Sequence, residues 1–456
     1  MSEKTLPRQH HSATELESLL KEGKYPQAAK TFLHLHPADQ AKYFKDLDSK
    51  AQLCLLKPLT TEEAADLFDE LSDEETVEIA RELSLPYLAD ILDDMDPDEA
   101  ADLLGDLSDA KAQRALSLME ETSDVLPLLP YPDETAGGRM TTEYIKLYQN
   151  TLTEKAIRYL RESAPPTDIP YYLFVTNENG KLVGVTGLRE LICGNPQAPI
   201  SELMKTDVIS ITADSDQEQA ARLMQHYDLS ALPVVDTNNN LLGVISHDDI
   251  LDVIEDEATE DIYRMANVSD NALEPDSKLS QQLRGRLPWL LLNTLTALFG
   301  SWVISNFEDL FIQVAVLAFF QSIVAAQGGN AASQNVAMIV RGLALGEVNT
   351  KKIWSVLFRQ LAVSASLGFI IGGLVGTGVG VWQGNPYLGL VLGLALLGNM
   401  LVAGVVGTLA PVALQLVGQD PALASSVLVT ALTDSLGFLI FLSLAKTFLP
   451  FIQQYI

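Results

Sequence analysis

The chain from residue 288 to its end consists of long apolar runs that very few charges interrupt. Several of these runs reach or exceed the roughly 20 residues that a helix needs to cross a bilayer. From residue 284 onward there are only seven basic and five acidic residues. The sequence therefore predicts an all-α membrane domain over residues 284–456, preceded by soluble domains.

One carboxylate, Asp434, lies inside an apolar run of this domain, residues 428–442. A charged side chain at a helix centre costs roughly 2.5–3.5 kcal/mol on insertion scales. Such a cost is met more often beside a polar pathway or a cation than in a purely structural helix. We therefore expect Asp434 to line an ion path, and the alternative is a buried structural acid.

We expect five transmembrane helices, at about 288–306, 311–340, 357–382, 387–417 and 423–448. Basic residues stand before the first span and in the loop after the second, namely Arg284, Arg286, Arg341, Lys351, Lys352 and Arg359. Because positive charge marks the cytoplasmic side, the N-terminus is predicted inside and the C-terminus outside.

The third span carries glycines at four-residue spacing, Gly368, Gly372, Gly376 and Gly380. Small residues at this spacing let helices approach closely. The pattern predicts helix packing, either within the domain or across a dimer.

The second span contains a polar, glycine-broken patch, residues 326–335. Such a patch is costly against lipid and should line protein or water. The pore-lining candidates are Asn330, Ser333, Gln334 and Asn335. A hydrated Mg²⁺ suits amide and hydroxyl groups, because this ion usually keeps several of its waters.

The preceding residues, 1–283, hold 23 basic and 55 acidic side chains. This excess of acid makes nucleic acid and anionic lipid poor partners and divalent cations plausible ones. Cys54 and Cys193 show no metal-ligand spacing and read as reduced core residues. Residues 1–17 contain no signal peptide, so we expect this part in the cytoplasm.

Residues 40–119 repeat with a period of twelve, and each block ends on Leu or Met. Connectors such as residues 72–75 and 96–99 supply capping residues and early acids for short helices. We predict an α-helical solenoid within an acidic N-domain, residues 1–130. The third position of successive blocks is Asp66, Glu78, Asp90 and Asp102. These acids form either a column of cation-binding carboxylates or an ordinary solvated face.

Residues 138–258 show a two-fold internal similarity. Residues 172–185 and 232–244 each contain two β runs around an Asn-rich or Gly-containing turn and end in Gly-Val, and each is followed by a helix start. These copies resemble a tandem α/β CBS pair, residues 138–200 and 201–258. The resemblance implies adenine nucleotide binding, possible at Tyr172, Arg189 and Tyr227, with ATP as a possible cofactor.

A connecting helix is expected over residues 259–283, between this pair and the first span. A dense cluster of acids leads into it, namely Asp248, Asp249, Asp252, Glu255, Glu257 and Glu260. These charges repel one another unless cations screen them. A bridging divalent cation would hold the junction closed.

Five motifs together carry a resemblance over nearly the whole chain: residues 288–293, 328–330, 341–347, 420–425 and 432–438. With them, the chain resembles the MgtE family of magnesium channels. The resemblance implies a homodimer in the lipid bilayer of the cell membrane, with a plug formed by the connecting helix. It also implies that intracellular Mg²⁺ closes the pore by holding the acidic domains together.

By position, the resemblance makes Asp434 the selectivity carboxylate, with Asn330 beside the ion. The regulatory Mg²⁺ residues would be Asp90, Asp216, Glu218, Asp228, Asp249, Asp252, Glu257, Glu260, Asp261 and Asp420.

Two other functions stay open. One is a transporter of the same architecture that uses a coupling ion or moves another divalent cation such as Co²⁺ or Ni²⁺. The other is a membrane-anchored nucleotide sensor. An enzyme is not expected, because the sequence offers no nucleophile-base pair, phosphate-binding glycine loop or metal-ligand histidines.

Overall fold

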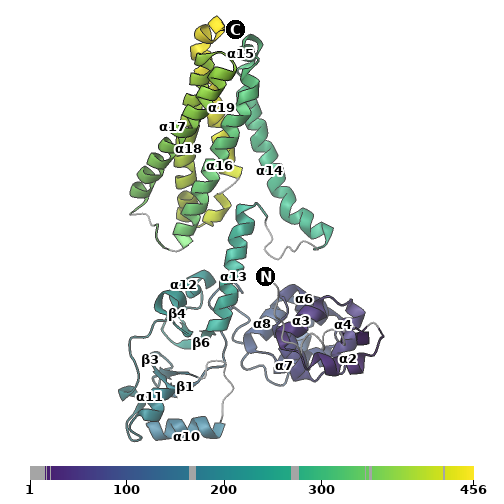
Figure 1. Ribbon diagram of the computed structural model, residues 1–456. Helices are drawn as coiled ribbons and strands as arrows, with labels where there is room; N and C mark the ends of the chain where they lie inside the picture. The colour runs from purple at the N-terminus through teal and green to yellow at the C-terminus, as the bar shows by residue number, and fades with distance from the viewer. Residues whose placement is uncertain are drawn as a thin grey trace. The chain divides into compact units, whose positions relative to one another are not determined.

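The computed structural model describes residues 16, 18–20, 22–163, 171–268, 277–344, 346–348, 352–424 and 427–455. The chain divides into two compact units, Met1–Ile254 and Glu255–Ile456. Each unit has its own arrangement of helices and strands (Figure 1).

The first unit begins with a regular series of short helices. They are α2 (Tyr25–Phe32), α3 (Pro37–Lys45), α4 (Ser49–Leu56), α5 (Thr61–Asp69), α6 (Asp73–Glu82), α7 (Leu85–Asp94), α8 (Pro97–Asp106) and α9 (Asp109–Leu116). From α3 to α9, each helix begins twelve residues after the one before it, which confirms the predicted period. Each helix contacts the helix two places further along the chain. α3 contacts α5, and α5 contacts α7; likewise α4 contacts α6, and α6 contacts α8. The helices therefore stack in two rows, as those of a solenoid do.

Local sequence explains where these helices begin and end. At α5 the Thr60 hydroxyl accepts from the Glu63 amide, and the Glu63 carboxylate accepts from the Thr60 amide. This reciprocal pair satisfies two of the amides that a helix start leaves unpaired. The residue that closes each repeat packs inward, as Leu59 and Leu107 do. Twelve residues thus suffice for one capped helix and one core anchor.

The second part of the first unit contains two similar three-stranded sheets. The first copy comprises β1 (Lys146–Tyr148), α10 (Thr153–Ser163), β2 (Tyr172–Thr176), β3 (Leu182–Gly187), α11 (Leu188–Cys193) and η1 (Ile200–Glu202). The second comprises β4 (Ile211–Thr212), α12 (Gln217–Tyr227), β5 (Ala231–Val235), β6 (Leu241–Ser246) and α13 (His247–Met265). In both, the first strand is parallel to the second, and the second is antiparallel to the third. The two predicted hairpins are confirmed.

The two copies pack against each other. The Leu182 amide donates to the Asn239 carbonyl at 2.9 Å, and the Leu241 amide donates to the Gly180 carbonyl at 3.2 Å. One buried apolar cluster combines Phe174 of the first copy with residues of the second. The copies therefore form a pair with a shared core.

The second unit is helical apart from its connections (Figure 1). After the end of α13 it comprises α14 (Leu279–Ser305), α15 (Glu308–Gln313), α16 (Leu317–Ala344), α17 (Ile353–Trp382), α18 (Pro386–Leu416), η2 (Pro421–Ala424), α19 (Val427–Ile452) and η3 (Gln453–Tyr455). α18 lies at its centre, in contact with α16, α17 and α19, and α14 lies along α19.

Four helical segments in the described part of the chain are long and apolar enough to cross a membrane: Leu279–Ser305, Ile353–Trp382, Pro386–Leu416 and Pro421–Thr447. The expected second span is different. It is divided into α15 and α16, because Val314 leaves the helical conformation with φ −140° and ψ 74°. α16 has 28 residues, but it is not among the four, and its interior includes the polar patch at residues 326–335.

The expected connecting helix at residues 259–283 also differs from the structure. Its first residues continue α13, which begins at His247 within the second sheet copy. Its last residues belong to α14, which begins at Leu279. The middle of the segment, residues 269–276, lies outside the described residues. Glu255, Glu257 and Glu260 are good helix formers and α13 contains no Gly or Pro, so nothing in the local sequence ends α13 at the domain boundary.

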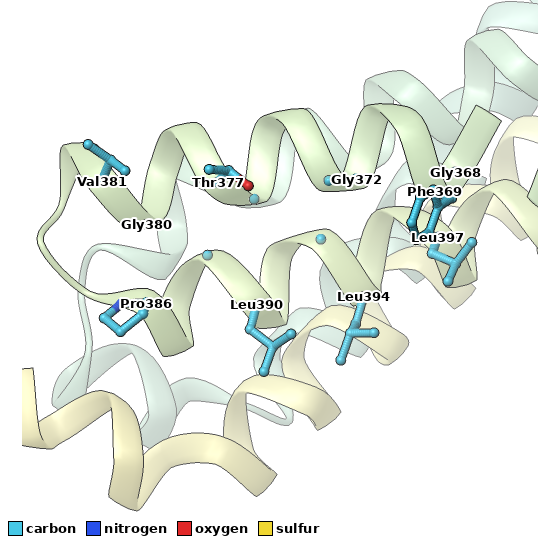
Figure 2. A pocket seen from close by; sticks show the side chains of 14 residues that line it. Gly368, Phe369, Gly372, Thr377, Gly380, Val381, Pro386, Leu390, Leu394 and Leu397 are labelled. Carbon is cyan, nitrogen blue, oxygen red and sulfur yellow. The ribbon is translucent and has the colours of Figure 1, made fainter. Parts of the chain in front are cut away.

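The predicted glycine packing is confirmed within the domain, between α17 and α18. A Cβ atom on Gly372 would lie 2.6 Å from the Gly393 carbonyl oxygen, and one on Gly376 would lie 2.6 Å from that of Gly389. Beside this contact, the two helices border a groove of about 520 Å³ (Figure 2). Phe369, Thr377 and Val381 line it from α17, and Leu390, Leu394 and Leu397 from α18.

This packing yields a prediction about stability. Gly376→Ala would push the added methyl group into the backbone of α18, so we expect a loss of about 1–3 kcal/mol, as for other overpacked sites. The matched control is Gly373→Ala on the same helix, where nothing lies within 4 Å of an added Cβ atom. It should be neutral or slightly stabilising, because Ala favours helices. Thermal unfolding of the detergent-purified variants tests this, and equal melting temperatures would contradict it.

Candidate functional site

The acidic residue of the apolar bundle, Asp434, lies in the first half of α19 and is partly exposed. Its neighbours Thr433 and Ser435 are buried. The Thr433 hydroxyl donates to the Val429 carbonyl of the same helix at 3.0 Å. Asp434 thus stands between two small polar residues, on a helix in contact with α14, α16 and α18.

The polar patch of α16 divides between two faces of the helix. Asn330, Ser333 and Gln334 are exposed. Their spacing places them on one side of the helix. Asn335 is buried instead, and its amide group donates to the Ala403 carbonyl of α18 at 3.5 Å. Asn335 therefore packs between helices, while the other three pore-lining candidates lie on the exposed face of α16.

Sequence reasoning missed a second amide inside the bundle, Asn399 of α18, which is only 1% exposed. Its Nδ2 donates to the Val324 carbonyl of α16 at 2.8 Å. The signal that could have identified it is its position as a single amide in an apolar stretch, residues 394–403. Such residues inside membrane helices are functional candidates for the same reason as acids are.

The end of α13 carries a cation that the sequence reading also missed. Arg264 forms ion pairs with Glu260, one turn earlier on α13, and with Asp420, which precedes η2. The other Asp420 oxygen accepts from the Ala422 amide at 2.7 Å. Next to Arg264, Met265 packs against a buried cluster that includes Ala422. Two carboxylates expected to bind Mg²⁺ are therefore brought together around an arginine.

Three of the other expected regulatory acids lie at the ends of α12. Asp216 precedes the helix and accepts from the Glu218 amide at 2.8 Å. Glu218 pairs with Arg222 one turn later. Asp228 follows the helix in the left-handed conformation, with φ 54°. Each of these residues thus has a local role at a helix end.

The remaining expected acids are distributed over α7 and α13. Asp249 is partly buried at the start of α13, where its carboxylate accepts from the Ser246 amide at 3.2 Å and from the Ser246 hydroxyl. Further along α13, Asp252 is exposed, and Glu257 and Asp261 are partly exposed. Asp90 is exposed on α7.

A cluster of partly buried acids lies on α5 and α8, and of its members the sequence analysis singled out only Asp102. Burial raises the pKa of Asp69 to about 8, with help from the Asp96 and Glu99 carboxylates. Burial likewise raises the pKa of Glu99 to about 7, with Asp73 and Asp249 adding repulsion.

Two more acids of α8 share this environment. Burial, together with the charge of Asp249, raises the pKa of Asp98 well above its usual range. Burial, and to a smaller extent the charge of Asp133, raises the pKa of Asp102. Asp102 and Glu99 also line a narrow cleft of about 10 Å³, together with Asp73 and Asp106. The first unit therefore concentrates acids here whose ionised form is disfavoured, and Arg139 offsets part of this effect at Glu99 and Asp102.

These acids do not converge on a ready-made metal site. Among the described residues, no three His, Cys, Asp or Glu side chains form a group that could hold a metal ion.

The three nucleotide candidates occupy different elements of the paired sheets. Tyr172, at the start of β2, is partly buried against the apolar cluster shared by the two copies. Arg189 of α11 is exposed, and Tyr227, at the end of α12, is 50% exposed. They offer aromatic and cationic groups, and their placement on separate elements does not define a pocket.

Family profiles match most of the chain. The profile of MgtE, described as a divalent cation transporter, matches residues 321–444, and the MgtE intracellular N domain matches residues 35–134. The CBS domain profile matches residues 136–193 and 200–256.

Named relatives and a solved structure agree with these matches. The chain is 38% identical to the magnesium transporter MgtE of Bacillus subtilis over 336 residues, which are 73% of this chain and 74% of that protein. It is 36% identical to that of Thermus thermophilus over 341 residues, 74% of this chain and 75% of that protein. A crystal structure of the cytosolic domain of the Mg²⁺ channel MgtE in complex with ATP is 34% identical, with a TM-score of 0.50, and covers 53% of this chain and 99% of that one.

The first two relatives are named as transporters and not as enzymes, as expected for this chain. The resemblance noted in the sequence is confirmed by their identity and coverage. The chain is a multidomain membrane protein with an N domain, a CBS pair and a helical membrane region, and it belongs to the MgtE family of divalent cation transporters.

Proposed function

We infer that the chain conducts Mg²⁺ across the cell membrane through its helical bundle, and that intracellular Mg²⁺ closes this path. The observation that carries the proposal is the carboxylate of Asp434, partly exposed on an apolar helix that contacts the polar helix α16. A carboxylate is costly in lipid unless a cation or water accompanies it. Asp434 would attract the ion, and Asn330 would hold its water shell.

The chemistry of the side chains favours Mg²⁺ over Co²⁺ or Ni²⁺. Those transition metals prefer imidazole or thiolate ligands, and no such ligand group occurs among the residues that the structure describes. Carboxylate, amide and hydroxyl oxygens are the ligands on offer in α16 and α19. A weakly dehydrated Mg²⁺ fits such a site.

The proposal includes a homodimer with five spans per chain. Only 6% of the apolar core segment of α14 is buried, and Asn330, Ser333 and Gln334 are exposed on α16. A polar face cannot rest against lipid, so a second copy is the natural cover for it. The basic residues that precede the apolar part of α14 place the N-terminal side of this helix in the cytoplasm. With α16 counted as the fifth span, the number of spans is odd, so the C-terminus lies outside.

For closure, we propose that Mg²⁺ acts on the acids of the N domain, the CBS pair and α13. Asp90, Asp216, Glu218, Asp228 and Asp249 would bind it in the soluble part, and Asp252, Glu257 and Asp261 along α13. The last turn of α13 would serve as the plug through Glu260 and Asp420, with Arg264 already holding these two together. Neutralising like charges would bias a two-state pore toward closure.

Nucleotide binding is a separate part of the proposal. ATP would bind the CBS pair near Tyr172, Arg189 and Tyr227, because a related cytosolic domain was crystallised with ATP.

Domain boundaries at residues 130, 138, 200, 258 and 283 are likewise proposed.

The path itself is tested by flux. Asp434→Asn removes the charge and keeps the side chain's shape, so Mg²⁺ uptake into proteoliposomes should fall by at least about tenfold, the factor of one charged hydrogen bond. The matched control is Asp309→Asn in α15, which should retain wild-type flux. Equal flux in both variants would remove Asp434 from the path, and preferential Co²⁺ or Ni²⁺ uptake by the wild type would favour the other cations.

A second prediction concerns pH. The carboxyls of Asp69 and Glu99 have raised pKa values, so the folded state binds protons that the unfolded chain releases. The resulting stabilisation is present in acid and is lost as the pH rises from about 4 through 8, by up to about 1.4 kcal/mol per pH unit and group. In chelator, the melting temperature should therefore fall between pH 6 and pH 8, and Mg²⁺ should reduce that fall.

Two substitutions control for this effect. Asp69→Asn should flatten the pH dependence in chelator, because it removes one titrating buried group. Asp46→Asn, at an exposed position, should leave it unchanged. Identical curves for the two variants would show that the buried acids do not set the pH dependence.

A third prediction concerns Arg264. Arg264→Gln leaves Glu260 and Asp420 without their cation, so the end of α13 should be held less firmly. At low internal Mg²⁺, flux should rise about two- to fivefold, the equivalent of a partly exposed ion pair worth about 0.5–1 kcal/mol. Arg158→Gln, which breaks the exposed pair with Glu154, is the control. Unchanged low-Mg²⁺ flux in Arg264→Gln would exclude the arginine from closure.

A further inference from the structure

The amide of Asn399 lies where three helices meet. It projects from α18 between Gly328 of α16 and Gly437 of α19. A Cβ atom on Gly437 would lie 2.6 Å from Asn399 Nδ2, and one on Gly328 would overlap the same nitrogen. Only glycine at both positions leaves room for the amide. The two glycines and Asn399 therefore form one fitted contact, here called the Asn399 notch.

Within the notch the two polar atoms of the amide differ. Nδ2 donates to the Val324 carbonyl of α16 at 2.8 Å. Oδ1 is fully buried and accepts no hydrogen bond from the part of the chain that the structure describes. An unpaired acceptor in such a site is costly and calls for a partner, usually water.

A second buried amide on the same helix shows what a purely structural arrangement looks like. Asn385, at the start of α18, donates through Nδ2 to the Ile452 carbonyl at 2.8 Å. Its Oδ1 accepts from the Leu388 amide at 3.1 Å. Both atoms of Asn385 are thus paired. Asn399 likewise donates through Nδ2 to a carbonyl of a neighbouring helix, but its Oδ1 accepts no hydrogen bond among the described residues.

The notch lies close along the chain to both parts of the proposed ion path. Gly437 follows Asp434 by three residues, almost one turn of α19. Gly328 precedes Asn330 by two residues on α16. Any shift of the Asn399 amide would therefore change the spacing between the carboxylate and the polar face of α16.

We propose that Asn399 is a positioning residue of the ion path. Through Nδ2 and the two glycines it fixes α16 against the turn of α19 that carries Asp434, and its Oδ1 binds a water molecule that belongs to the path. This role rests on the proposed function of Asp434. Asn399 affects the ion through the placement of α16 and α19 and through that water.

The test compares Asn399→Leu with Asn385→Leu in Mg²⁺ flux from proteoliposomes. Both substitutions keep the number and branching of the side-chain heavy atoms, replace the amide with bulkier methyl groups and remove one hydrogen bond between helices, so both are expected to lower the melting temperature. Asn399→Leu should also raise the KM for Mg²⁺ about tenfold, the effect of one misplaced hydrogen-bonding group, and change the ratio of Mg²⁺ to Co²⁺ flux. Asn385→Leu should leave the KM and the ratio at wild-type values.

Gly437→Ala provides a second route to the same geometry, because its methyl group must displace the Asn399 amide without removing any polar group. It should shift the KM and the flux ratio in the same direction as Asn399→Leu. The inference is overturned if the folded variants at both positions keep the wild-type KM and ratio, whatever their stability. Asp434→Asn in the same assay separates the two ideas: loss of flux there with no effect at Asn399 rejects only the role of Asn399.

Discussion

A polar group within a bilayer has to find its partner inside the protein, because lipid offers none. The described membrane bundle meets this constraint in three ways. Asn385 and Asn335 donate to carbonyls of neighbouring helices, which ties helix to helix. Asn399 makes one such bond and keeps an open oxygen. Asp434 is partly exposed and Asn330, Ser333 and Gln334 are exposed, so in the proposed ion path water or a cation would be their partner.

In the rest of the protein, negative charge likewise needs a neutralising partner, which is either an arginine or a proton. At the end of α13, the arginine side chain of Arg264 neutralises Glu260 and Asp420. In the cluster on α5 and α8, the pKa values of Asp69 and Glu99 are raised, so protons can neutralise these two acids. In the proposed closure mechanism, a divalent cation would compete with both. Since protons and Mg²⁺ bind the same oxygens, cation binding there releases protons and depends on pH.

The sequence predicted those features that depend on local pattern. The twelve-residue period gave the helix starts from Pro37 to Asp109, because each repeat carries its own cap and its own core anchor. The paired hairpins followed from β runs and turn residues. The features missed depend on tertiary packing. Burial raises the pKa of Asp98, with the charge of Asp249 on α13 adding repulsion, and the ion pair of Arg264 with Asp420 joins residues far apart in the chain. The break at Val314 was missed because an apolar run conceals a turn inside a predicted span.

The exposure of α16 links assembly to conduction. In a single chain, α18 is surrounded by α16, α17 and α19, while the face of α16 that bears Asn330 and Ser333 is left open. The tight glycine contact fixes α17 on α18, so the side of the bundle formed by α17 has no room to rearrange. The side formed by α16 and α19 is held at the Asn399 notch by one hydrogen bond and two glycines. Motion that opens or narrows the proposed ion path is therefore expected at α16 and α19, where the polar residues lie, and not at α17.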